Sequence, residues 1–110
     1  MALDSKKLNE NLFSKPLTKK ELKIIKQIEN YIDEEIQKKY NGNPVKINLK
    51  IAKFESGLDF LETDYCDIRK KVMFKELLNR YTKNNWIIEE EYNKRDEEDF
   101  LVFTPVENVN

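Results

Sequence analysis

The sequence contains no histidine, a single cysteine and only two glycines. Without histidine, the chain has no His general base, no Ser–His or Cys–His nucleophile pair and no His metal ligand. One cysteine, Cys66, excludes a disulfide framework, a thiolate zinc cage and an iron–sulfur cluster. The isolated glycines, Gly42 and Gly57, cannot form a glycine-rich phosphate loop. We therefore expect a protein that is not an enzyme, with no catalytic residue, no cofactor and no metal site.

Long apolar runs are absent as well. No apolar stretch reaches the roughly 18 residues that a membrane span needs. The N-terminal residues MALDSKKLNENLF lack the apolar core and the small-residue cleavage site of a signal peptide. Together these features predict a protein that stays in the cytosol where it is made.

The residues that are present favour one folded domain. The 110 residues are 39% hydrophobic and include one Trp, five Tyr and six Phe, which is too much aromatic material for a disordered chain. The length is that of a single domain. We divide the chain into an N-terminal arm (1–16), a single α+β domain (17–104) and a C-terminal tail (105–110).

The arm carries apolar side chains outside the main periodic pattern. Leu8 and Leu12 are four residues apart, and Asp4 or Ser5 could cap a short helix before them, ended by Pro16. Because no other pattern in the chain accounts for these side chains, we expect the arm to dock onto another subunit. The predicted contact residues are Leu8, Leu12 and Phe13.

The strongest periodicity follows the arm. Thr18-Lys-Lys-Glu21 has the spacing of a capping box. Apolar residues then recur at steps of three and four, namely Leu22, Ile25, Ile28, Ile32, Ile36 and Tyr40. The stretch Asn41-Gly42-Asn43-Pro44 ends the pattern, with Gly42 free to take a left-handed conformation. These features predict a long helix over 18–41.

Two further elements precede the C-terminal third. Val45, Ile47, Leu49 and Ile51 alternate with polar residues, which predicts a strand with one buried face and one basic face. A second helix runs from about Asp64 or Ile68 to Thr82. Its apolar residues fall on two opposite faces, with Phe74, Leu77, Leu78 and Tyr81 on one and Tyr65, Ile68 and Val72 on the other. Either the helix bends or it is covered on both sides.

The C-terminal third predicts a β-hairpin. Apolar segments at 86–92 and 100–103 flank the polar loop NKRDEED, and Pro105 ends the second strand. Trp86, Ile88 and Tyr92 share one face of the first strand. The order is α-α-β-α-β-β, which favours an α+β fold: a long N-terminal helix, a three-stranded antiparallel sheet and a second helix, with helices on one face of the sheet.

Charge is distributed unevenly along the chain. The net charge is −1, but residues 1–53 carry +5 and residues 86–110 carry −6. An acidic hairpin with these charges predicts a contact with a basic partner, or head-to-tail association of copies. The predicted contact residues are Glu89, Glu91, Asp96, Glu97, Glu98 and Asp99.

An alternative is nucleic-acid binding. Helix, strand, helix and hairpin is the element order of a winged helix, and the second helix carries polar and basic residues of the types that read bases and phosphates. The candidate contacts are Arg69, Lys75, Asn79, Arg80 and Lys83. The acidic hairpin and the net charge of −1 oppose this alternative.

The end of the chain follows a further pattern: a helix with a tyrosine, a short polar turn, a tryptophan that opens a strand, and an aromatic final strand. The residues are Leu77-Leu78-Asn79-Arg80-Tyr81, Lys83-Asn84-Asn85, Trp86-Ile87-Ile88 and Phe100-Leu101-Val102-Phe103. This pattern resembles small α+β proteins of tailed bacteriophages. Those proteins usually have Gly where Asn85 stands, and Asn tolerates the same left-handed turn. The resemblance concerns the arrangement of helix, turn and strands, and it implies no functional residues.

The resemblance also implies a location in the host cytoplasm or in the virion. We accordingly expect a protein–protein interaction module, a structural or accessory component of a phage virion assembly, whose partners are other subunits of a homo- or hetero-oligomer and not a membrane. The alternatives are a winged-helix-like DNA-binding protein and a phage inhibitor that binds a host enzyme through its acidic hairpin.

Overall fold

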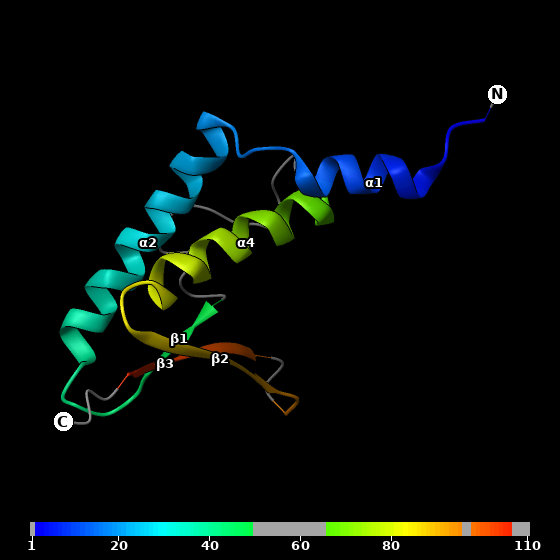
Figure 1. The fold of residues 1–110 in the computed structure, drawn as a ribbon. Helices are drawn as coiled ribbons and strands as arrows, with labels where there is room; N and C mark the ends of the chain where they lie inside the picture. Colours follow the sequence, from blue (N-terminus) through cyan, green and yellow to red (C-terminus); the bar gives the residue numbers. More distant parts are fainter. Residues whose placement is uncertain (1, 50–65, 96–97, 107–110) are drawn as a thin grey trace.

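The computed structural model describes residues 2–49, 66–95 and 98–106, which form an α+β fold (Figure 1). The elements are α1 (Ser5–Ser14), α2 (Lys19–Lys39), β1 (Val45–Asn48), α4 (Asp67–Thr82), β2 (Trp86–Asn93) and β3 (Glu98–Pro105). Their order confirms the predicted α-α-β-α-β-β arrangement. The long helix is the second one, because a helix of ten residues precedes it. Within the described ranges, no helix combines the length and the apolar character that crossing a membrane requires.

Helix α2 begins at the predicted capping box. The Glu21 backbone N–H donates to Thr18 Oγ1 at 3.1 Å, and the Thr18 N–H donates to Glu21 Oε1 at 2.9 Å. The buried side chains in the middle of the predicted stripe are Ile25, Ile28, Ile32 and Ile36. Its two ends differ from the prediction, since Leu22 and Tyr40 are exposed while Ile24 is buried. The 21 residues span about 32 Å at 1.5 Å per residue, and Leu22 and Tyr40 lie at the two ends of that length.

The sheet has strand order β1-β3-β2, and both pairings are antiparallel. Leu101 and Phe103 on the central strand are fully buried beneath the helices, which lie on one side of the sheet (Figure 1). Phe103 pairs with Val45 on β1 and with Ile88 on β2. Strand β1 ends at Asn48, before the predicted alternation ends, and Ile51 lies outside the described residues.

Two residues have a positive φ where the chain turns. Gly42, after α2, has φ 98°, and Asn85, between α4 and β2, has φ 68°. Both confirm the left-handed conformations predicted from the sequence. The turn at Asn85 leads into Trp86, whose ring meets Tyr40 and Phe103 edge-on at 5.7 and 6.3 Å. Trp86 therefore anchors the sheet to the end of α2.

The buried face of α4 matches a predicted face only in part. The buried residues recur at steps of four and are Arg69, Met73, Leu77 and Tyr81. Leu77 and Tyr81 belong to the predicted face, whereas Phe74 and Leu78 of the same predicted face are only partly buried. Helix α4 contacts α1, α2 and β2, so it is covered on more than one side within a single chain. This arrangement accounts for the apolar residues on opposite faces.

Candidate functional site

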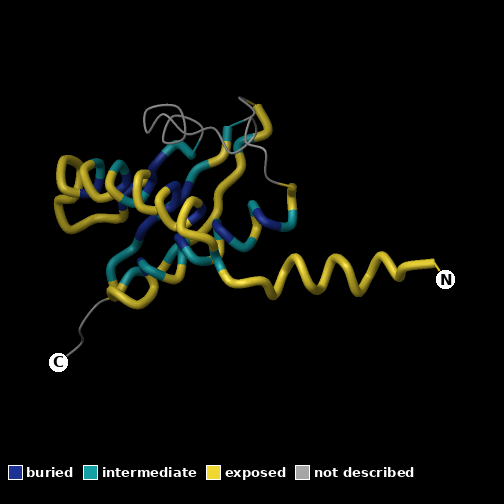
Figure 2. The backbone as a smooth tube through the Cα atoms, turned by 90° about the horizontal axis from the view of Figure 1, so that it is seen from above, coloured by how far each residue is buried: buried dark blue, intermediate teal, exposed yellow. Residues whose placement is uncertain are grey.

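The N-terminal helix α1 projects from the body of the protein. Asp4 is its N-cap, and Asp4 Oδ1 accepts a 2.9 Å hydrogen bond from the Lys6 N–H, as the sequence predicted. No residue of α1 is buried, and Leu8, Leu12 and Phe13 are 46%, 37% and 50% exposed. Figure 2 shows the arm extending outward, exposed along its whole length. The molecule accordingly measures 59 × 35 × 29 Å.

Arg69 anchors the base of this arm. Its Nη1 donates to the carbonyl oxygens of Leu12 and Lys15 at 2.7 and 2.8 Å, and its Nη2 donates to that of Pro16 at 3.3 Å. These carbonyls end α1 and begin the connection to α2, where a cation also interacts favourably with the helix dipole. Arg69 was predicted to contact nucleic acid. That prediction is wrong, because its side chain is buried and its guanidinium is used inside the protein.

Glu21 neutralises the buried guanidinium. Arg69 donates to Glu21 through Nη2 at 2.6 Å and through Nε at 3.0 Å. These hydrogen bonds hold the pKa of Glu21 below its ordinary value of 4.5, although burial acts in the opposite direction. Sequence reasoning assigned Glu21 to the capping box alone. No local sequence pattern signals the pair, because Glu21 and Arg69 lie 48 residues apart in the sequence.

The other candidate nucleic-acid contacts on α4 separate into two groups. Lys75, Asn79 and Lys83 are exposed. Arg80 is partly buried and pairs with Glu76 at 3.2 Å and with Glu29 of α2 at 3.5 Å. The structure thus leaves Lys75, Asn79 and Lys83 on the solvent side and turns Arg80 toward α2.

The acidic hairpin is exposed over most of its described length. Glu89, Glu91 and Asp99 are exposed and Glu98 is partly buried, while Asp96 and Glu97 lie outside the described residues. Lys46 of β1 pairs with Glu91 at 2.8 Å, and its Nζ lies 4.4 Å from the centre of the Phe100 ring. The basic first half and the acidic end of the chain therefore meet on the outer face of the sheet. Both partners of this pair are about half exposed, so its contribution to stability is small.

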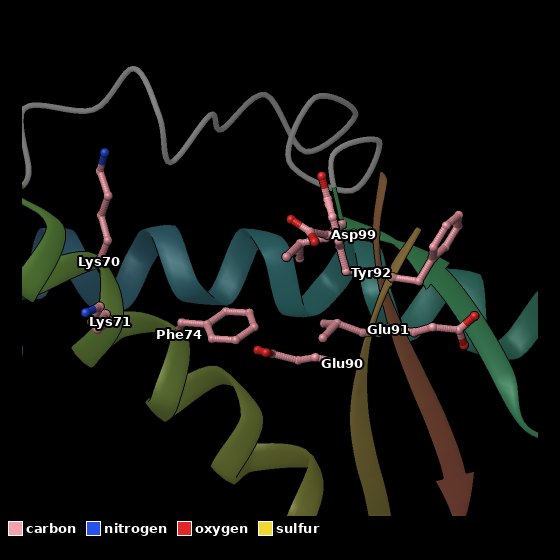
Figure 3. Close-up of a pocket in the computed structure, with 10 residues that line it drawn as sticks. Lys70, Lys71, Phe74, Glu90, Glu91, Tyr92 and Asp99 are labelled. Atoms are coloured by element: carbon pink, nitrogen blue, oxygen red, sulfur yellow. The ribbon is translucent and has the colours of Figure 1, made fainter. Parts of the chain in front are cut away.

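A cavity of about 440 Å³ lies between α4 and the hairpin (Figure 3). Lys70 and Lys71 line it from the helix, and Glu90 and Asp99 line it from the strands. Phe74 and Glu90 point toward one another in Figure 3, whereas Glu91 points away. Further lining residues are Leu49, Tyr92, Phe100 and Leu101. A cavity with an apolar base and charges of both signs at its edge can accept polar and apolar side chains of another molecule.

The described residues hold no cluster of three or more acidic or Cys side chains that could bind a metal ion. The geometry therefore offers surfaces for association: the exposed arm, the solvent side of α4 and the acidic hairpin. Comparison of the chain with protein-family models, with curated proteins and with solved structures finds no match.

Proposed function

We propose that this protein is a non-enzymatic protein–protein interaction module that docks onto another subunit through α1. One observation carries the proposal: a helix of ten residues projects from the domain with Leu8, Leu12 and Phe13 exposed. An isolated helix shorter than about 12 residues is marginal in water. Tertiary packing normally supplies the missing stability, and α1 buries none of its own residues.

The anchoring of the arm supports the same proposal. Arg69 binds the carbonyls at the end of α1, so the arm leaves the domain in a defined direction. An interaction element that is already oriented loses less conformational entropy when it binds. Burial of the exposed apolar side chains against a partner would stabilise the complex by about 25 cal/mol for each Å² removed from water.

The subunit partner we propose belongs to a bacteriophage virion assembly. The support is the resemblance of the C-terminal third to small tailed-phage proteins. The positive φ of Asn85, directly before Trp86, agrees with the turn that this resemblance requires.

Co-expression with the neighbouring genes of the same locus tests the docking function. The full chain should co-purify with its partner, and the variant Leu8→Ser/Leu12→Ser should lose that partner. Ile87→Ser is the matched control, because Ile87 is an equally exposed apolar residue on the outer face of the sheet. A complex that survives deletion of residues 1–15 would rule out docking through the arm.

Nucleic-acid binding is a second candidate, favoured by the exposure of Lys75 and Asn79 on α4 and of Lys83 at its C-cap, directly before the hairpin. The opposing feature is Glu90, which lines a second depression between α4 and β2 together with Lys75 and Asn79. Binding to duplex DNA in a gel-shift assay should weaken with salt and with Lys75→Ala or Lys83→Ala. The absence of any shift at low salt would dismiss this candidate.

Inhibition of a host enzyme is a third candidate, favoured by the exposed carboxylates of Glu89 and Asp99, which make no ion pair within the described residues. A basic host enzyme captured by the full chain should be released when Glu89→Gln and Asp99→Asn are combined. Capture that is independent of both carboxylates would exclude this candidate.

A further inference from the structure

One face of α1 carries no charge. Leu8 and Leu12 lie at its centre, and the residues beside them on the helix are Ser5, Asn9 and Asn11. At 100° per residue the charged side chains Lys6, Lys7 and Glu10 all lie more than 90° from this centre. A face of this kind meets a copy of itself without repulsion between like charges.

A depression lies at the base of the arm. It has a volume of about 190 Å³, and its apolar lining consists of Phe13, Leu17 and Val72. At the opposite end of the arm, Leu3 is 81% exposed, more than any other large apolar side chain of the described residues. The arm thus has an apolar side chain at its tip and an apolar depression at its base.

We propose that the partner of the arm is the arm of a second copy of this chain, bound antiparallel about a two-fold axis. This inference rests on the proposed docking function of α1. In the register that places Leu8 against Leu12 of the second copy, residue i faces residue 20−i. Beyond the helix, this pairing brings Leu3 of one copy to the base of the other copy's arm, where Leu17 and the depression lie. Each contact occurs twice, as an isologous interface requires.

Charge complementarity supports this register. Asp4 comes to lie beside Lys15 of the second copy, at each end of the helix pair. Both side chains are exposed, and neither forms an ion pair within the described residues. Antiparallel pairing also sets the positive N-terminal end of each helix beside the negative C-terminal end of the other.

The projection of the arm leaves room for this arrangement. Arg69 holds the base of α1, and the helix points away from the sheet (Figures 1 and 2). In the proposed pair the two bodies therefore lie at opposite ends of the helices. The contact involves about ten residues a side, against the roughly 20–30 of a standard interface. We therefore expect a weak dimer that forms only at high protein concentration.

Sedimentation equilibrium of the full chain, from about 1 µM to about 1 mM, tests the dimer. Leu3→Glu should raise the dissociation constant at least tenfold and leave the circular dichroism unchanged, because Leu3 precedes α1. Val106→Glu is the matched control, an equal charge change at an exposed apolar residue away from the arm. A full chain that is monomeric near 1 mM overturns the inference. The co-purification experiment above then shows separately whether the arm docks onto a different protein.

Disulfide trapping in a Cys66→Ser background tests the antiparallel register. Chains with Leu8→Cys and chains with Leu12→Cys should form mixed disulfides with one another. Each variant alone should link poorly, because position 8 faces position 12 of the second copy. Efficient self-linking of each single variant would indicate parallel helices and overturn the proposed register.

Discussion

Arg69 and Glu21 form a buried two-point ion pair across 48 residues of sequence. Their side chains are only 7% and 2% exposed. The remaining donors of Arg69 bind carbonyls at the end of α1, and Glu21 also caps α2. One pair of side chains therefore joins α1, α2 and α4.

Replacement of Arg69 should destabilise the fold strongly. Arg69→Met leaves the Glu21 carboxylate buried without its counter-ion, which costs about 3–5 kcal/mol of unfolding free energy. Urea denaturation measures the loss. Arg80→Met is the control, because the ion pairs of Arg80 are partly exposed and should contribute at most about 1 kcal/mol.

A double variant distinguishes the loss of the ion pair itself from the cost of leaving one buried charge unpaired. Glu21→Leu/Arg69→Met removes both charges together, so no buried charge is left unpaired. We expect it to recover most of the stability lost in Arg69→Met. If the double variant is as unstable as the single one, the carbonyl contacts of Arg69 hold the fold and the ion pair does not.

Acid should weaken the fold through Glu21. Its pKa is lower in the folded state than the ordinary 4.5, because Arg69 donates hydrogen bonds to the ionised form. Between the lowered pKa of Glu21 and 4.5, the folded state therefore binds fewer protons than the unfolded state. The stabilisation is complete above about pH 4.5 and is lost as the pH falls through the lowered value. Denaturation midpoints between pH 7 and pH 3 measure this loss. Glu21→Gln should make the decrease of stability with falling pH less steep.

The Tyr81 hydroxyl links α4 to α2. It lies 2.8 Å from Asp33 Oδ1 and 3.0 Å from the Glu29 carbonyl oxygen. Burial, and then the hydrogen bond to Asp33, raise the pKa of Tyr81. We expect Tyr81→Phe to cost about 1–2 kcal/mol by chemical denaturation. Tyr92→Phe, at an exposed tyrosine of β2, should change stability by less than about 0.5 kcal/mol.

The turn at Asn85 offers a substitution that should stabilise the protein. Its φ of 68° is strained for a residue with a side chain and is free for glycine. Asn85→Gly should keep or raise the melting temperature, and Asn85→Ala should destabilise by about 1 kcal/mol. The opposite ranking in thermal denaturation would contradict the left-handed conformation at this position.

Interactions between residues close in sequence were sufficient to predict much of the fold. The capping box at Thr18, the left-handed turns at Gly42 and Asn85, and the end of β3 at Pro105 all depend on residues close in sequence. Period-two alternation likewise placed Val45 and Ile47 on the buried face of β1. These features follow from the sequence because backbone conformation and near-neighbour hydrogen bonds decide them.

Only the tertiary structure decided which face of α4 is buried and where the arm points. The apolar residues of α4 lie on two opposite faces, so its periodicity does not select one of them. The buried residues Arg69 and Met73 belong to neither of the two predicted faces. Arginine is usually exposed in folded proteins. Arg69 is buried because Glu21 neutralises its charge and the carbonyls of α1 accept hydrogen bonds from its guanidinium. Those partners lie 48 or more residues away, beyond the range of any local pattern. The exposed arm, on which the proposed association depends, is held in place by this long-range compensation of a buried charge.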